Sequence, residues 1–115
     1  MIIVYDSNTG VGKRFAESLG YPTQSIKKKL DAPCILITRN AGAGKIPWST
    51  KSFIKKHQGL IKGFVNNGDS IKHGKTYCGA TPLIIEKYGL VHIRNIDQGG
   101  NDEDIQAVQE FLESC

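Results

Sequence analysis

The feature that most constrains this chain is a repeated unit in which a short, unbroken apolar run is followed by a polar loop. Ile2 to Tyr5 form the first apolar run, Cys34 to Thr38 form the second, and Leu60 to Val65 form the third. Short runs of this kind, rich in β-branched residues, are typical of strands that are buried on both faces of a parallel sheet. The sequence therefore predicts a mostly parallel sheet built from these segments.

Helical patterns fill the intervals between the apolar runs. Val11, Phe15 and Leu19 recur every fourth residue and mark one face of a first helix. A second helix is predicted with Pro47 in its first turn, extending to Gly59.

The same alternation continues to the end of the chain. Residues 77–88 predict a helix with Thr81 as its cap and Pro82 in its first turn. Residues 91–96 predict a last strand, and a closing helix follows with three acidic residues at its positive N-terminal end.

Four strand–helix units in succession predict an α/β fold, a three-layer sandwich in which a parallel sheet lies between helices on both faces. We expect a single domain over residues 1–115, since compact domains usually have about this length. Residues 21–30 are ambiguous, and a short edge strand around Pro22 to Ser25 is compatible with them.

The composition, 39% hydrophobic and 23% charged, is ordinary for a globular protein. No apolar run approaches the roughly 18–20 residues of a membrane-spanning helix, and the N-terminus lacks a signal-peptide pattern. We therefore expect no membrane partner and a cytoplasmic location. Cys34, Cys78 and Cys115 lie far apart without a C-x-x-C pair, which favours neither a disulfide framework nor a metal site.

The chain is basic, with 15 Lys and Arg against 11 Asp and Glu, a formal charge of +4. Lysines cluster at residues 27–29, 55–56 and 72–75. Such clusters can attract nucleic acid or phosphorylated ligands. Because no nucleic-acid-binding motif accompanies them, we interpret most of these lysines as solvated and expect no nucleic-acid partner.

Three polar loops, residues 6–12, 38–45 and 66–74, each follow a predicted strand. In parallel α/β sheets, ligands bind beyond the carboxyl ends of the strands, where the strand order reverses. The first loop lies between a buried strand and a helix start, so its Ser and Thr hydroxyls and the helix N–H groups suit a phosphate. The alternative is a plain helix cap. Three such loops together favour an anionic cofactor.

Two dipeptides, Gly12-Lys13 and Gly44-Lys45, look like the end of a nucleoside-triphosphate P-loop. That motif requires Gly four residues before its Gly-Lys and Ser or Thr directly after it. Both segments fail at both positions, so nucleotide hydrolysis is not expected.

The segment Tyr5-Asp6-Ser7-Asn8-Thr9-Gly10, with Lys13-Arg14-Phe15 after it, resembles a flavodoxin-type phosphate loop. More narrowly, the chain resembles the NrdI proteins, small flavodoxin-like partners of class Ib ribonucleotide reductase. The likeness continues through Ile35 to Thr38 with Gly42, Gly44 and Pro47, and ends near Asp104-Ile105.

The resemblance implies one bound flavin mononucleotide (FMN). No metal site is expected, because His57 and His92 lack clustered acidic or thiol companions. It implies a phosphate site at Ser7, Asn8, Thr9, Gly10 and Val11. It places along one side of the flavin ring the residues Thr38, Arg39, Asn40, Ala41, Gly42 and Ala43. Along the other side it places Asn67, Gly68, Asp69, His73, Gly74 and Tyr77.

In this family the reduced flavin reacts with oxygen, and the resulting oxidant builds the tyrosyl radical of the dimanganese small subunit, NrdF. The resemblance implies NrdF as a partner and a flavin or thiol reductase as the source of electrons. Two other functions are compatible with the residues: a general flavodoxin-type electron carrier and a cofactor-free α/β regulatory domain.

The chain departs from the family pattern at several positions. Arg39 occupies a position that is often aromatic or Pro, and His73 stands where a ring-stacking aromatic is common, with Tyr77 as an alternative stacking residue. For Trp48 we favour packing on the helix start over a role as partner anchor, and Cys78 is interpreted as a buried packing residue.

Overall fold

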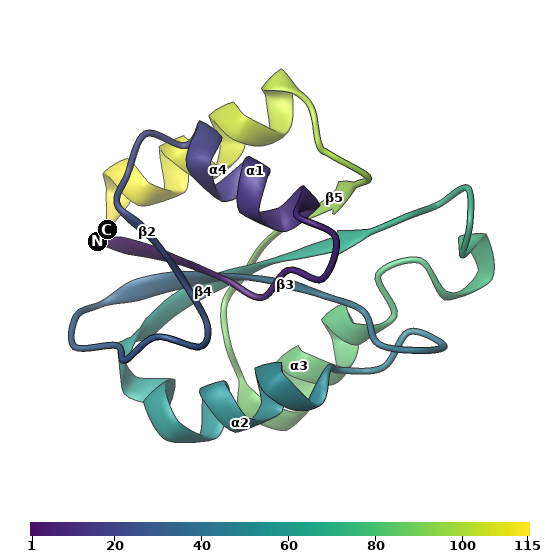
Figure 1. Ribbon diagram of the computed structural model, residues 1–115, viewed down its shortest axis with the longest axis horizontal. Coiled ribbons are helices and arrows are strands. Elements are labelled where there is room, and N and C mark those ends of the chain that lie inside the picture. The colour runs from purple at the N-terminus through teal and green to yellow at the C-terminus, as the bar shows by residue number, and fades with distance from the viewer.

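A computed structural model describes residues 1–115 as a five-stranded parallel sheet between two layers of helices (Figure 1). The strands are β1 (Ile2–Tyr5), β2 (Thr23–Ser25), β3 (Cys34–Arg39), β4 (Ile61–Gly68) and β5 (His92–Asp97). The helices are α1 (Val11–Ser18), α2 (Trp48–His57), α3 (Ala80–Tyr88) and α4 (Asp102–Ser114), with 3-10 turns η1 (Gln58–Leu60) and η2 (Gly74–Thr76). The predicted α/β sandwich with helices on both faces is confirmed, and so is the short edge strand.

The sheet buries two apolar cores because successive side chains of a strand point to opposite faces. On one face Ile3 and Ile37 pack with Phe15 of α1 and Val108 of α4. On the other face, Leu36 and Phe64 belong with side chains of α2 and α3 to a second cluster. The uninterrupted apolar runs of the sequence therefore correspond to strands covered on both sides.

All strand pairs are parallel, and the spatial order is β2-β1-β3-β4-β5. The order reverses between β1 and β3, since the chain moves outward from β1 to β2 and then returns to the other side of β1. The carboxyl ends of the strands face one edge of the sheet, on the right in Figure 1, and both chain termini lie at the opposite edge. Loops that follow different strands are thereby brought together.

Strand β4 is longer than predicted. It continues through Asn66 and Asn67 to Gly68, residues that were expected to form a loop. The side-chain amide of Asn66 is buried and donates to Asn40 Oδ1 at 3.1 Å and to Thr81 Oγ1 at 3.0 Å. These partners lie on other elements, so a polar residue can occupy a buried strand position.

Helix α3 begins at Ala80, and its cap is Gly79 rather than the predicted Thr81. Residues 77–79 of the predicted helical segment lie before the helix. Thr81 is buried inside the first turn, where its hydroxyl donates to Asn95 Oδ1 at 2.6 Å. Pro82 lies in the first turn, as predicted. The Thr81 side chain thus joins α3 to β5 instead of capping the helix.

Two further predictions concern single side chains. Trp48 begins α2 but is 81% exposed, so the favoured packing on the helix start is wrong. Cys78 is buried, as expected, with Sγ 3.7 Å from the carbonyl oxygen of Asn66.

None of the helices has the length and apolarity needed to cross a membrane.

Candidate functional site

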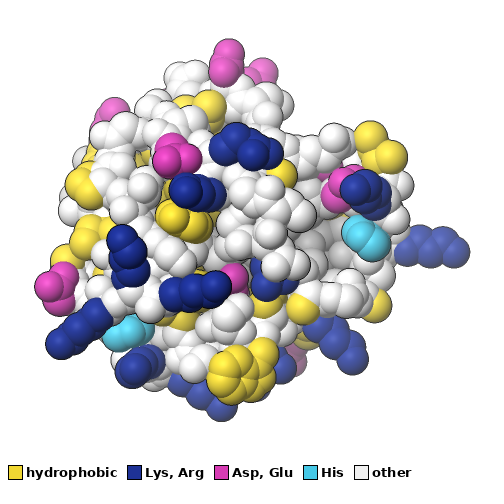
Figure 2. Space-filling model, viewed as in Figure 1, with side chains coloured by type: hydrophobic (Ala, Val, Ile, Leu, Met, Phe, Trp, Pro, Cys, Tyr) yellow, Lys and Arg dark blue, Asp and Glu magenta, His cyan; other side chains and the backbone are white.

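A cleft of about 710 Å³ opens at the carboxyl edge of the sheet, and the loops after β1, β3, β4 and β5 all contribute to it. In Figure 2 the lobe on the right, formed by the segment after β4, carries basic and histidine side chains. The cleft is polar, with Val11 as its one hydrophobic lining residue. Its lining residues are Asp6, Ser7, Asn8, Thr9, Val11, Gly12, Arg14, Arg39, Asn40, Asn67, Gly68, Asp69, Lys72, His73, Gln98 and Gly99.

The first wall of the cleft is the loop between β1 and α1. Gly10 has φ +86°, a left-handed conformation that glycine adopts readily, and its N–H donates to Ser7 Oγ at 3.0 Å. No side chain caps α1, and its first turn holds no acidic residue. The unpaired N–H groups at this helix end, with Arg14 against Gly10, suit an anion.

The second wall is built around a buried carboxylate, Asp6, which is 6% exposed. The Oδ2 atom of Asp6 accepts hydrogen bonds from Ser49 Oγ at 2.5 Å and from Thr50 Oγ1 at 2.7 Å. Its Oδ1 atom lies 3.7 Å from Nε of Arg39. A carboxylate in an anion site would repel the ligand, but these partners offset the charge of Asp6 and hold Arg39 at the cleft.

The third wall joins the loops after β4 and β5. The side-chain amide of Asn67 donates to the carbonyl oxygen of Gln98, and the N–H of Gln98 donates to the carbonyl oxygen of Gly68 at 2.7 Å. Gly68 leaves no room for a side chain, since a Cβ there would lie 2.8 Å from Cys78 Sγ. The backbone is therefore close-packed where it borders the cleft.

The projecting loop after β4 is organised by two aspartates. Asp69 Oδ1 accepts hydrogen bonds from the N–H groups of Ile71 and Lys72, both at 3.0 Å. These bonds form a tight turn just before His73 in the chain. Asp97 accepts from the Ser70 hydroxyl and, at 2.9 Å, from the Ser70 N–H. These hydrogen bonds from Ser70 lower the pKa of the Asp97 carboxyl.

The residues beside this loop are shielded from the cleft. Burial raises the pKa of the Tyr77 hydroxyl to about 12, and the neighbouring Cys78 thiol adds to the effect. Burial also raises the pKa of the Cys78 thiol. The Tyr77 ring packs against Gly68, where an added Cβ would lie 3.0 Å from it, and Tyr77 is not among the residues that line the cleft.

The structure brings ten of the predicted site residues into one cleft: Ser7, Asn8, Thr9, Val11, Arg39, Asn40, Asn67, Gly68, Asp69 and His73. It leaves outside the lining Gly10, Thr38, Ala41, Gly42, Ala43, Gly74 and Tyr77. Thr38 is fully buried and shares a hydrogen bond of 2.6 Å with the Thr50 hydroxyl. Gly42 and Ala43 lie at the exposed tip of a turn closed by Ala41 and Lys45.

The predicted site set omitted several lining residues: Asp6, Gly12, Arg14, Lys72, Gln98 and Gly99. Gln98 and Gly99 follow β5, and the rule that placed the other three loops at this edge applies equally to the loop after the last strand. Arg14 lies one helical turn after Gly10, a spacing that places it over the phosphate loop. No local sequence pattern predicts the role of Asp6, because its partners Ser49 and Thr50 are distant in sequence.

The cleft favours ligands with negative charge and many hydrogen-bonding atoms. Arg14, Arg39 and Lys72 supply positive charge, and the exposed loop N–H groups and amides supply donors and acceptors. No three His, Cys, Asp or Glu side chains are grouped to hold a metal ion.

Solved structures with the same architecture come from the flavodoxins. A short-chain flavodoxin associated with a non-canonical PDU bacterial microcompartment has a TM-score of 0.66 at 17% identity, covering 97% of this chain and 93% of that one. A flavodoxin from Fusobacterium nucleatum bound to flavin mononucleotide has a TM-score of 0.61 at 14% identity, covering 98% and 94%. The fold and its edge cleft therefore define a flavodoxin-like protein.

Sequence comparison identifies the family to which this chain belongs within the flavodoxin-like class. The model of the NrdI flavodoxin-like family matches residues 3–110, and the chain belongs to that family. The protein NrdI of Deinococcus radiodurans is 30% identical, with 96% of this chain and 81% of the relative covered. The protein NrdI of Bacillus licheniformis is 26% identical, with 96% and 86% covered.

Proposed function

We propose that the chain binds FMN in the edge cleft. The observation that carries this proposal is the convergence of four strand-end loops on an uncapped helix N-terminus at the point where the strand order reverses. Family membership supports it, and the solved flavodoxin from Fusobacterium nucleatum holds FMN in the same fold. The cleft volume of about 710 Å³ lies within the usual range for cofactor sites.

In this proposal the loop after β1 holds the phosphate. The N–H groups at the start of α1, the hydroxyls of Ser7 and Thr9, and the Arg14 guanidinium provide the donors. Arg39 and Asn40 border one side of the ring, and the segment from Asn67 to His73 borders the other. No Phe, Tyr or Trp lines the cleft, so His73 is the ring that remains for stacking.

We further propose that the protein serves class Ib ribonucleotide reductase. When bound, FMN supplies two-electron redox chemistry, and its reaction with oxygen provides the oxidant that assembles the dimanganese-tyrosyl radical of the small subunit, NrdF. The residues of this chain bind and orient the flavin, and Arg39 and Lys72 favour its negatively charged reduced form. A flavin or thiol reductase supplies electrons, and the reaction takes place in the cytoplasm.

Two measurements test the proposal in sequence. Titration with FMN, followed by absorbance and calorimetry, should show uptake of one FMN per chain. The reduced, FMN-loaded protein is then mixed with the manganese-loaded small subunit and oxygen, and the tyrosyl radical is counted by electron paramagnetic resonance. Free reduced FMN at the same concentration is the control and should give far less radical.

The results separate this function from the two alternatives. Uptake of FMN without radical formation would favour a general electron carrier, for which the flavodoxin likeness of the fold is the supporting observation. Absence of FMN uptake would favour a cofactor-free regulatory domain.

A further inference from the structure

A second hollow, of about 580 Å³, lies between α2 and α3, away from the cleft. We call it the α2–α3 groove; its lining residues are Lys45, Ile46, Lys51, Leu83, Glu86 and Lys87. None of them lines the cleft. Ile46 is buried and forms an apolar part of the groove, and Leu83 is 41% exposed. The groove thus combines an apolar surface with three lysines.

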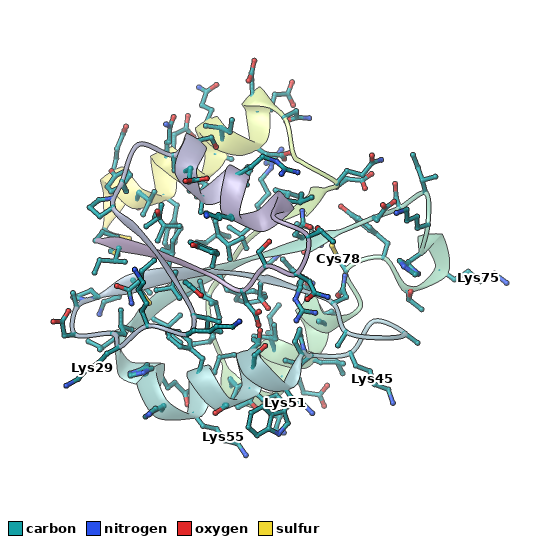
Figure 3. The ribbon with its side chains drawn as sticks, in the orientation of Figure 1. Lys29, Lys45, Lys51, Lys55, Lys75 and Cys78 are labelled. Atoms are coloured by element: carbon teal, nitrogen blue, oxygen red, sulfur yellow. The ribbon has the colours of Figure 1, made fainter.

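The positive charge of this surface is not neutralised within the chain. The two salt bridges of the structure join Arg39 to Asp6 and Arg94 to Asp104, and neither involves a lysine. Helix α2 carries three lysines and no acidic residue. In Figure 3, Lys45, Lys51 and Lys55 all project outward from the α2 side of the molecule. Glu86 is the one acidic residue in the groove lining.

Trp48, the only tryptophan, stands beside the groove at the start of α2 and is 81% exposed. Lys51 follows it by three residues, so the two side chains lie on neighbouring positions of the helix surface. Leaving an indole in water forgoes the stabilisation of burying a large apolar surface. Tryptophan is one of the residues enriched at binding hot spots between proteins.

We propose that the α2–α3 groove docks an acidic segment of a partner protein. An apolar side chain of that segment rests on Ile46 and Leu83, its carboxylates pair with Lys45, Lys51 and Lys87, and Trp48 covers it at the rim. This interaction surface is separate from the cleft and does not depend on the FMN proposal.

The chemistry of the groove favours an acidic protein segment over the other two occupants that a basic surface can take. A nucleic acid would be held by phosphate contacts and successive stacking aromatics, whereas this surface offers one aromatic, an apolar floor and a carboxylate. A second copy of this chain would offer chiefly its acidic helix α4, which lies on the other face of the sheet. Such a head-to-tail contact would build rings or filaments, because it does not pair the same surface on both copies as a twofold dimer does.

The proposal can be tested by selecting peptides from a random dodecapeptide display library on the folded protein, with and without added FMN. We expect the selected peptides to carry several Asp or Glu residues around one aromatic or aliphatic residue. Their binding is then measured through the emission of Trp48, which lies three residues before the groove residue Lys51. The triple variant K45E/K51E/K87E should lose at least tenfold in affinity, and Trp48→Ala, measured by calorimetry, should also lose several-fold.

The matched control is K27E/K28E/K29E, which reverses the same charge at three exposed lysines elsewhere; its affinity should stay within twofold of the parent protein. Circular dichroism should be unchanged in each variant. If the triple variant does not fold, the single variants Lys51→Glu and Lys87→Glu in the parent chain provide the same comparison.

Several results would overturn the proposal. Selection could yield no binders, binders without acidic residues, or binders that the groove variant retains. Tighter binding of a 20-nucleotide single-stranded RNA with the same dependence on the three lysines would indicate a nucleic acid instead. Self-association that the groove variant abolishes would indicate a second copy of this chain.

Discussion

At the scale of the residue, the most informative side chain is Asp6. Its carboxylate is buried in a wall of the proposed FMN cleft, where two hydroxyls of α2 and the Arg39 guanidinium lie around it. The sequence predicted the loop that contains Asp6 but not this role, because Ser49 and Thr50 lie more than forty residues away. Contacts over such distances in sequence arise only when the sheet and α2 have come together.

Arg39→Gln should lower the midpoint reduction potential of bound FMN. In the proposed binding mode Arg39 lies beside the ring, and removing its positive charge disfavours the negatively charged reduced form. We expect a decrease of roughly 30 mV or more, which for a two-electron couple corresponds to about 1.4 kcal/mol. Potentiometric titration followed by absorbance provides the measurement.

Arg14→Gln serves as the control for this variant, because Arg14 lies at the proposed phosphate end of the cleft. It should weaken FMN binding in both redox states and leave the potential nearly unchanged. An equal shift in both variants would mean that Arg39 acts through the general field of the protein and not beside the ring.

The three cysteines should differ sharply in reactivity. Burial raises the pKa of the Cys34 thiol to about 12 and raises that of Cys78, whereas Cys115 is exposed. Since the thiolate is the reactive form, only Cys115 should react rapidly with Ellman's reagent at pH 8.

One thiol per chain should therefore react in the native protein and three in guanidinium chloride. Cys115→Ser should remove the fast phase. A fast phase that persisted in this variant would show that one of the two buried thiols is accessible.

At the scale of the element, the sequence predicted the order of strands and helices well and their ends less well. The apolar runs defined β1 and β3, because strands covered on both faces carry a strong pattern. The end of β4 and the start of α3 were misplaced, because Asn66 and Thr81 are polar residues whose side chains hydrogen-bond to each other and to Asn40 and Asn95. A local pattern contains no information about such partners.

The contact between Gly44 and Gly79 should be essential for the junction of the loop after β3 with α3. A Cβ on Gly79 would lie 2.8 Å from the carbonyl oxygen of Gly44, which is backbone and cannot move aside. Gly79→Ala should therefore destabilise the protein by roughly 1–3 kcal/mol. Urea unfolding followed by circular dichroism measures the change.

Gly74→Ala is the matched control, since nothing lies within 4 Å of the added Cβ. It should alter the free energy of unfolding by less than about 0.5 kcal/mol. Equal destabilisation by the two substitutions would contradict the close packing of this junction.

Helix α4 depends on its N-terminal cap. The Asn101 side chain accepts from the N–H of Asp104 at 2.9 Å, and the Asp104 carboxylate accepts from the N–H of Asn101 at 2.9 Å. Asn101→Ala should lower the free energy of unfolding by about 1 kcal/mol. Asn101→Asp retains an accepting oxygen and should change it by only a few tenths of that amount, so a similar loss in both would argue against the capping role.

At the scale of the whole molecule, the two helical layers have different surfaces around the same sheet. The layer of α2 and α3 carries unpaired lysines and the exposed indole, whereas α4, in the other layer, begins with three acidic residues. The basic charge was evident in the sequence, but its gathering around a groove was not, because residues 45, 51 and 87 come together only through the packing of α2 beside α3.

The exposure of Trp48 leads to a prediction for the intact protein. Its emission maximum in the native state should nearly coincide with that in urea, because the indole is 81% exposed before unfolding begins. Circular dichroism should report the full unfolding transition over the same urea range. A pronounced blue shift in the native protein would mean that the indole is covered in solution.

Both chain ends lie at the edge of the sheet opposite the cleft (Figure 1). An affinity handle, a fluorophore or an immobilising tether attached to either end would extend away from the ligand-binding side. The molecule can therefore be anchored to a sensor surface or joined to another polypeptide with its cleft still open to solution.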